Sequence, residues 1–331
     1  MEKSSYRQKI LNKIPEFEQK KLFDVDLEDD PPSKELMPDE VDYLGKKLSS
    51  KIKTKFAYFS AKRFMLKMIK KHKLIISKIN GLENLKNLKT GAVLTCNHFN
   101  PLDSFAMEYL FRECKFKNKK LYRVIREGNY TNFPGFYGMI MRNCHTLPLS
   151  RNSETMKNFL RAVDYHLKNN NLVLVYPEQA LWWNYKKPRP LQDGAFKFAT
   201  KSDVPVVPIF ITMEDTVYLD DEGYPVQAYT INVFPPIYQN KQKSKAENVF
   251  DMKKKNFQLW VNCYEKTYNT KYDLKIDWKD ICKNIFFNTK SYPHFHILFK
   301  IYKKFSLFII LFVLFMLNFK KVRELWQILS F

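Results

Sequence analysis

The stretch AVLTCNHFNPLDSFAMEYLF, residues 92–111, decides the fold that this chain is expected to adopt. Its first part, 92–96, is apolar and follows a turn, which predicts a buried strand. Its last part, 105–111, contains good helix formers with apolar residues at helical spacing, which predicts a helix. Asn100 followed by Pro101 is typical of a helix N-cap with proline at the first helical position. The stretch therefore predicts a strand, a short loop and a helix.

His98 and Asp103 carry the reactive groups of this stretch. His98 leaves the predicted strand and Asp103 lies in the first helical turn, so the bend between them can bring the carboxylate back to the imidazole. A neutral imidazole accepts a proton from a hydroxyl near pH 7, and a carboxylate on its other nitrogen fixes the tautomer. The pair is predicted to be a general base and its orienting partner, acting on a substrate hydroxyl. The alternative is that Asp103 only complements the helix dipole and His98 is an ordinary loop residue.

Four further segments follow in order. They are TLPLSR at 146–151, YPEQAL at 176–181, GAFKFA at 194–199 and VPVVPI at 204–209. The first is a short apolar strand that ends in an arginine, and the second follows a continuous apolar strand. The third is a glycine-led helix and the fourth is another strand. Strands that alternate with helices in this way predict an α/β fold with a covered sheet.

This series resembles the glycerolipid acyltransferases, the enzymes related to 1-acylglycerol-3-phosphate acyltransferase. The family's first block is Asn-His-x4-Asp, and its second ends in an arginine after a short strand. Its third is usually Pro-Glu-Gly-Thr-Arg, and its fourth is an apolar strand with prolines. The resemblance covers residues 74–237. The matching residues are Asn97, His98, Asp103, Arg151, Pro177 and Glu178.

The resemblance implies a substrate-binding role for the residues outside the His-Asp pair. Arg151 would bind the phosphate of the acceptor, since a guanidinium matches a phosphate with two hydrogen bonds. Glu178 would order the acceptor site by hydrogen bonding, and Asn97 and Pro177 are placed with it as substrate-binding residues. The ordinary alternatives are that Arg151 is a solvated strand end and that Glu178 is a turn residue beside a helix dipole.

The third block departs from the family's pattern. Leu181 occupies the place of the family's arginine, and Lys186, Lys187 and Arg189 follow downstream. Lys186 and Arg189 are expected to supply the lost charge to the substrate, although a solvated loop is the alternative. The departure leaves the identity of the acceptor open more than the type of reaction.

The predicted fold class is α/β, a glycerol-3-phosphate acyltransferase-like sheet flanked by helices. It is expected to carry an N-terminal amphipathic helix and a C-terminal hydrophobic helix. Four parts are expected: an acidic, partly disordered appendage at 1–50, a basic amphipathic helix at 51–73, the acyltransferase domain at 74–275, and an extension at 276–331 with a membrane-inserting helix at 305–319.

Charge is distributed unevenly along the chain. The formal net charge is +22, which calls for an anionic partner. The first fifty residues hold nine basic and twelve acidic residues, so the remainder carries about +25. The acidic run 24–32 ends in two prolines and is expected to be loop or disordered, as a solvated appendage. No signal peptide is expected, since no apolar core follows the mixed-charge start.

The segment 51–73 interleaves basic and apolar residues, and Ile52, Phe56, Phe59 and Arg63 fall at helical spacing. A basic amphipathic helix with aromatic residues suits an anionic membrane surface. The alternative, that the stripe packs on the catalytic domain while the lysines are solvated, stays open. Many relatives in the resembled family place helices at the membrane just before the catalytic core, which favours the membrane interpretation.

The segment 305–319, FSLFIILFVLFMLNF, is a continuous apolar run. It has fifteen residues. As a helix it would be about 22 Å long, whereas a helix that spans a bilayer normally needs ~20 residues. Lys303, Lys304, Lys320 and Lys321 bracket it and can extend its reach by snorkelling. Membrane insertion is preferred to a buried core helix, which would need apolar cover on every side. A short span and a shallow dip both remain open.

The cysteines are odd in number, scattered and never in a C-x-x-C pair, which argues against a disulfide framework and a zinc site. They are Cys96, Cys114, Cys144, Cys263 and Cys282. We expect a membrane-associated protein whose catalytic domain lies in a reducing, cytoplasmic compartment.

The predicted activity is transfer of a fatty acyl group from an acyl thioester to the hydroxyl of a lysoglycerolipid, first of all 1-acylglycerol-3-phosphate, giving phosphatidic acid. The resemblance implies acyl-CoA or acyl carrier protein as the donor substrate, with no bound cofactor and no metal. The expected partners are a lysophospholipid acceptor, an anionic membrane and acyl carrier protein, and not nucleic acid. Two alternatives remain: transfer to another lysophospholipid or glycolipid, and a non-catalytic basic membrane- or nucleic-acid-binding protein that retains the fold.

Overall fold

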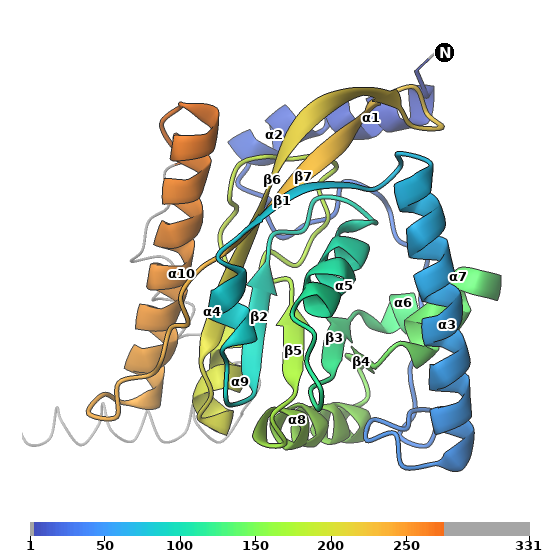
Figure 1. Ribbon diagram of the computed structural model, residues 1–331, viewed down its shortest axis with the longest axis vertical. Coiled ribbons are helices and arrows are strands. Elements are labelled where there is room, and N and C mark those ends of the chain that lie inside the picture. The colour runs from blue at the N-terminus through green and yellow to red at the C-terminus, as the bar shows by residue number, and fades with distance from the viewer. Residues whose placement is uncertain (1–2, 275–331) are drawn as a thin grey trace, which may run out of the picture. The chain divides into compact units, whose positions relative to one another are not determined.

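The computed structural model describes residues 3–274. In this part of the chain, seven strands form one mixed sheet with the order β1-β7-β6-β2-β5-β3-β4 (Figure 1). The strands are β1 (Ile75–Asn80), β2 (Ala92–Cys96), β3 (Leu121–Ile125), β4 (Thr146–Pro148), β5 (Leu172–Val175), β6 (Val206–Leu219) and β7 (Pro225–Val233). The five strands from β6 to β4 run parallel, and β7 runs antiparallel to β6 and pairs with β1. The predicted α/β class, a sheet flanked by helices, is confirmed.

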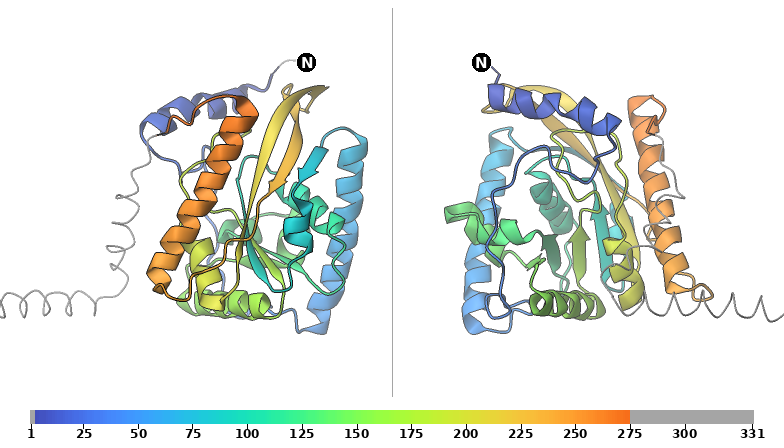
Figure 2. Two further views of the ribbon diagram at one scale, coloured as in Figure 1. Left: turned by 60° about the vertical axis from the view of Figure 1, so that its left-hand side comes forward. Right: turned by 180° about the vertical axis from the view of Figure 1, so that it is seen from behind.

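Helices cover both faces of this sheet (Figure 2). They are α1 (Ser5–Asn12), α2 (Ile14–Gln19), α3 (Leu48–Lys70), α4 (Leu82–Lys86), α5 (Asp103–Glu113), α6 (Glu127–Thr131), α7 (Gly135–Asn143), α8 (Ser153–Lys168), α9 (Gly194–Ser202) and α10 (Lys245–Tyr268). Leu94 and Cys96 of β2 share a core cluster with Leu110 of α5. Thr95, between them, donates a hydrogen bond of 2.6 Å to Asn256 of α10. Because side chains alternate along a strand, α5 and α10 lie on opposite faces.

The carboxyl ends of the parallel strands place several polar side chains along one edge. His98 follows β2, Glu178 follows β5, Glu127 follows β3 and Arg151 follows β4. Since these four strands are parallel neighbours in the sheet, the residues that follow them lie at the same edge. Ligands of parallel α/β sheets bind at this edge as a rule.

Most strands begin and end close to the predicted residues, but β6 extends further than its sequence suggested. The apolar pattern predicted a strand over 204–209, whereas β6 continues to Leu219 as one arm of a hairpin with β7. Glu214 and Asp215 are polar, so the hydrophobic pattern stops before the strand does. Backbone pairing with β7 sustains the strand there, and hydropathy does not record it.

Helix α3 confirms a helix where the basic segment 51–73 predicted one, shifted by three residues to Leu48–Lys70. It packs inward through Ala57, Ala61 and Met65, whose side chains are buried. The predicted apolar stripe faces the other way. Its large side chains, each more than half exposed, are Leu48, Ile52, Phe56, Phe59 and Leu66.

The N-terminal segment is not the solvated appendage that its acidity suggested. Leu27 and Leu36 are almost completely buried, and Leu27 shares a cluster with Ile10 and Trp182. The indole nitrogen of Trp182 donates a hydrogen bond of 2.9 Å to the carbonyl oxygen of Val25. The acidic run packs against the rest of the protein because Leu27, between its carboxylates, is buried. A single apolar residue in a charged run gives no periodic signal.

The predicted C-terminal extension, 276–331, and its hydrophobic segment, 305–319, lie outside the described residues. Between residues 3 and 274, none of the helices combines the length and the apolar character that crossing a bilayer requires.

Candidate active site

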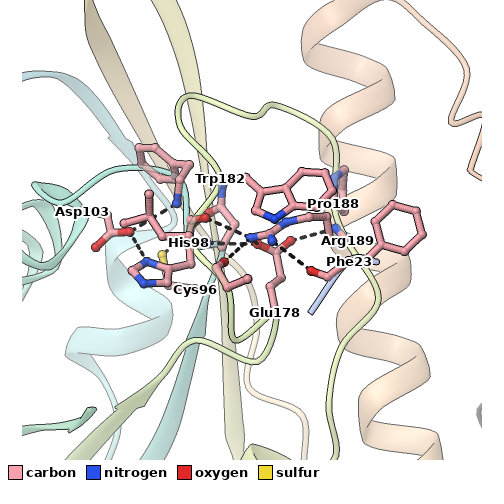
Figure 3. Close-up of polar contacts among 12 residues, drawn as sticks. Phe23, Cys96, His98, Asp103, Glu178, Trp182, Pro188 and Arg189 are labelled. Atoms are coloured by element: carbon pink, nitrogen blue, oxygen red, sulfur yellow. Dashed lines mark hydrogen bonds and ion pairs between the residues drawn. The ribbon is translucent and has the colours of Figure 1, made fainter. Parts of the chain in front are cut away.

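His98 and Asp103 form a hydrogen-bonded pair at the end of β2 (Figure 3). The Nδ1 atom of His98 lies 2.7 Å from Oδ2 of Asp103. Asp103 is 1% exposed, while the His98 side chain is 22% exposed. The strand delivers His98, and the first turn of α5 delivers Asp103, as the sequence predicted. The buried carboxylate holds one ring nitrogen, so Nε2 is the nitrogen available to a substrate.

Asp103 is fixed by its surroundings as well as by His98. Its Oδ2 atom also accepts a hydrogen bond of 3.3 Å from the backbone N–H of Phe99. The loop is further held by Asn100, whose side-chain oxygen accepts a bond of 2.9 Å from the backbone N–H of Leu102. The predicted N-cap at Asn100 is wrong, because α5 begins at Asp103 and its cap residue is Leu102. Asn100 instead orders the turn before the helix, which returns the carboxylate to the imidazole.

Tyr176 stacks on His98 and was not identified from the sequence. The two ring centroids are 4.3 Å apart, with 24° between the ring planes. The Tyr176 hydroxyl lies 3.1 Å from Oγ of Ser104, next to Asp103 in the chain. Burial raises the pKa of Tyr176 well above its ordinary value, and the charge of Asp103 adds to this effect. Its position at the end of β5, directly before the third block, was the available signal.

Glu178 and Arg189 form a buried ion pair that holds the backbone of His98 (Figure 3). The pair is 2.9 Å long, and both side chains are at most 2% exposed. Oε2 of Glu178 accepts a hydrogen bond of 3.0 Å from the backbone N–H of His98. Nη2 of Arg189 donates one of 3.0 Å to the carbonyl oxygen of His98. The peptide groups on both sides of His98 are therefore fixed by one ion pair.

Arg189 therefore does not have the position that the sequence suggested. It was expected to offer its charge to the substrate, but its guanidinium lies in the interior. Besides Glu178 and His98, it donates to the carbonyl oxygens of Phe23 and Ala180 at 3.1 and 2.6 Å. Arg189 therefore holds the loop and the His98 backbone in place and does not offer its charge at the surface.

The other residues expected to bind substrate have mainly structural contacts in the described part of the chain. Asn97 exchanges two hydrogen bonds with the backbone of Ile211, at 3.0 and 2.8 Å, which joins β2 to β6. The carbonyl oxygen of Pro177 accepts a bond of 2.8 Å from the backbone N–H of Gln192. Lys186 lies over the ring of Tyr268, 5.4 Å from its centroid.

Arg151 lies two strands beyond β5 at the same edge and is largely exposed. Its Nε donates a bond of 2.8 Å to Oε2 of Glu127, and its Nη2 donates one of 2.6 Å to the carbonyl oxygen of Ser33. The side chain is 65% exposed. With three steps between β2 and β4 at about 4.8 Å each, the strand ends before His98 and Arg151 are roughly 14 Å apart. One ligand can touch both only if the guanidinium reaches back along the edge.

Glu127 is the second residue that the sequence did not single out. It accepts hydrogen bonds from the backbone of Leu36 at 2.8 Å and from the hydroxyl of Ser150 at 2.8 Å, in addition to Arg151. Burial alone would raise the pKa of Glu127, but these bonds from Leu36, Ser150 and Arg151 outweigh it and lower the pKa. Glu127 thus ties the N-terminal segment to the arginine, a long-range contact that the sequence could not reveal.

A protein-family model described as Acyltransferase matches residues 76–212. This part of the chain is therefore similar to the acyltransferases. Among solved structures, the crystal structure of the 1-acyl-sn-glycerophosphate acyltransferase PlsC from Thermotoga maritima is similar, with 16% identity, a TM-score of 0.40, and coverage of 66% of this chain and 85% of that chain. No curated protein matches.

The matched region contains the central side chains of the site described above. The His98–Asp103 pair, the stacked Tyr176 and the Glu178–Arg189 pair all lie within 76–212. The N-terminal segment lies outside the matched region but contributes contacts to the site, such as the hydrogen bond from Trp182 to the Val25 carbonyl oxygen. Among the described residues, no group of histidine, cysteine and acidic side chains is arranged to hold a metal ion.

Proposed function

We propose that this acyltransferase moves a fatty acyl group from an acyl thioester to the hydroxyl of a lysoglycerolipid, with 1-acylglycerol-3-phosphate as the first candidate acceptor. One observation carries the proposal: His98 is bonded to buried Asp103 through Nδ1 and is partly exposed, within an acyltransferase domain. A base that is oriented on one side and open on the other suits deprotonation of a hydroxyl.

The reaction balances without a protein nucleophile. Nε2 of His98 takes the proton of the acceptor hydroxyl, and the oxygen attacks the thioester carbonyl to form a tetrahedral intermediate. The C–S bond then breaks, and the imidazolium returns the proton to the leaving thiolate. Asp103 keeps Nδ1 protonated throughout and stabilises the imidazolium. The products are one ester and one thiol.

The acyl donor is proposed to be acyl-CoA or acyl carrier protein, each acting as a substrate. The long donor and the lipid acceptor both have to reach the open side of His98. The arrangement of strand ends supports an anionic acceptor, because Arg151, which follows β4 at the same edge, is an exposed cation that an anionic head group could bind. Lys186, which lies over the ring of Tyr268, is a second candidate cation.

An anionic membrane is the proposed location of the acceptor. Helix α3 exposes an apolar stripe that includes Phe56 and Phe59, and lysines accompany it along the helix. Helix α7 packs beside α3 (Figure 1) and adds the exposed aromatic rings of Phe136 and Tyr137. Apolar side chains flanked by lysines suit insertion into the head-group region of an anionic bilayer. This arrangement supports the membrane interpretation of the 51–73 segment over packing of its stripe on the domain.

The proposed compartment is a reducing one, with the catalytic domain on the cytoplasmic side of the membrane. The four cysteines in the described residues are free thiols, and three of them are buried. Burial raises the pKa of Cys96 and of Cys144, which keeps both thiols protonated and unreactive.

A panel of substrates tests the proposal. The full chain in lipid or detergent is given lysophosphatidic acid, other lysophospholipids and a glycolipid, each with acyl-CoA and with acyl carrier protein, and the products are identified by mass. Phosphatidic acid as the main product supports the proposal. A main product from another lysolipid would replace the acceptor, because the third block departs from the family at Leu181. No product with any pair would favour a binding protein that retains the fold.

A further inference from the structure

Tyr176 contacts the side chain of His98, whereas the Glu178–Arg189 ion pair holds the His98 backbone. A substitution of Tyr176 therefore acts on the imidazole and leaves the ion pair in place. The Tyr176 ring is stacked on the imidazole at 4.3 Å, and its hydroxyl is bonded to Ser104. Ser104 follows Asp103 in the first turn of α5, while Tyr176 follows the last residue of β5. The phenol therefore bridges the third block and the helix that carries the carboxylate.

The hydrogen bond to Asp103 does not by itself fix the plane of the imidazole. A ring held at Nδ1 can still tip about that bond, which moves Nε2 away from the acceptor hydroxyl. A stacked ring closes one face to this motion. The same ring also stabilises positive charge on its face, because a cation within about 6 Å of an aromatic centroid is attracted to it.

We propose that Tyr176 is a positioning residue for the acyl transfer: its ring fixes the plane of His98 and stabilises the imidazolium, and Ser104 anchors its hydroxyl. The inference rests on the proposed function, in which His98 is the base. The stabilisation applies when His98 is protonated, that is, after it has taken the proton of the acceptor. Removing the ring should therefore lower kcat more than it changes KM.

The test uses the full chain with Tyr176→Leu, which removes the ring, and Tyr176→Phe, which removes only the hydroxyl. Tyr176→Leu should lower kcat about tenfold, with KM for the acceptor within roughly twofold. Tyr176→Phe should recover most of kcat. Tyr122→Leu is the matched control, because Tyr122 is also stacked on a histidine, His166, at 3.6 Å but precedes the site along β3. The Tyr122→Leu variant should be less stable, but the dependence of its kcat on pH should stay that of the unmodified chain.

A second series keeps the shape of the ring if Tyr176→Leu does not fold. Phenylalanine with increasing fluorination is incorporated at position 176, which weakens the attraction of the ring for a cation. The titration midpoint of the His98 imidazole, followed by NMR with labelled histidine and assigned with His98→Ala, should move to lower pH as fluorination increases. A midpoint that does not move, or a loss of kcat that Tyr122→Leu reproduces, overturns the inference. If the unmodified chain transfers no acyl group, the proposed function fails, while the titration still decides the role of Tyr176.

Discussion

Arg189 and Glu178 form an ion pair of 2.9 Å in the interior, and each hydrogen-bonds one side of the His98 backbone. An unpaired charge at this depth would be costly, so the pair is stable only as a unit. In the structure the pair holds the His98 backbone at the end of β2, and neither charged group is exposed. The sequence placed both residues near the site, but it could not show that they bind each other.

Separating this pair should destabilise the fold. Arg189→Gln leaves the carboxylate of Glu178 buried and without its guanidinium, which should cost about 3–5 kcal/mol of unfolding free energy. Glu178→Gln should cost a similar amount, and the double variant should cost less than the sum of the two. Chemical denaturation of all three variants measures this coupling. Additive losses would show that the two residues act independently, and Lys186→Gln, on the same loop, should change stability little.

Arg151 provides a test of head-group recognition. Arg151→Lys keeps the positive charge but loses the paired N–H groups, so KM for a phosphate-bearing lysolipid should rise about tenfold. KM for a neutral acceptor should change little. Because Arg151 is 65% exposed, stability should hardly change. Equal losses on both acceptors would show that its contacts with Glu127 and Ser33 are its main role.

The free energy of unfolding should fall as the pH drops below about 6.5, the ordinary pKa of histidine. Burial lowers the pKa of His145 to about 3, and nearby Lys120 and Arg123 add to this effect. Between pH 3 and 6.5 the unfolded chain binds a proton at this histidine that the folded chain does not, so stability increases with pH over that window. At pH 5 the deficit from His145 is up to about 2 kcal/mol.

His145→Asn tests this pH dependence, since asparagine does not titrate and tolerates the positive φ of 50° at this position. The variant should have a flatter slope of unfolding free energy against pH between 4.5 and 6.5. Some slope should remain, because burial also lowers the pKa of His166. An unchanged slope would show that His145 is protonated in the folded protein.

The exposed stripe of α3 should contribute to membrane binding. The double variant Phe56→Ser/Phe59→Ser removes two large exposed side chains and should weaken binding of the full chain to anionic vesicles at least tenfold. The weakening should persist at high salt, because salt does not screen apolar burial. Tyr165→Ser, which changes an exposed aromatic side chain on α8, is the control and should bind normally. Equal binding by the double variant and the control would remove α3 from the membrane surface.

Local sequence signals predicted the elements that carry the site. The apolar run and the helical spacing that follows it predicted the strand, loop and helix that bring His98 to Asp103, because all of these contacts lie within a few residues. The cap was placed two residues too early, at Asn100 instead of Leu102. The same reasoning missed Tyr176 and Glu127, whose partners lie 72 and 91 residues away. It also misjudged Arg189, since residue type cannot show whether a cation points into solvent or into the interior.

The acidic N-terminal segment shows the same limit. Its composition suggested disorder, but Leu27 and Leu36 find buried positions that exist only once the sheet has formed. Single apolar residues in a charged run give no period, so only the tertiary structure reveals their role.

The most direct test of the account is the rate of acyl transfer by His98→Ala. The variant removes the proposed base but little of the core, so its far-UV circular dichroism and unfolding midpoint should stay close to those of the unmodified chain. The initial rate with the best acceptor and donor of the panel should fall at least a thousandfold, and Asp103→Asn should fall by several orders of magnitude through the wrong tautomer. A folded His98→Ala variant with close to full turnover would contradict the assignment of His98 as the base.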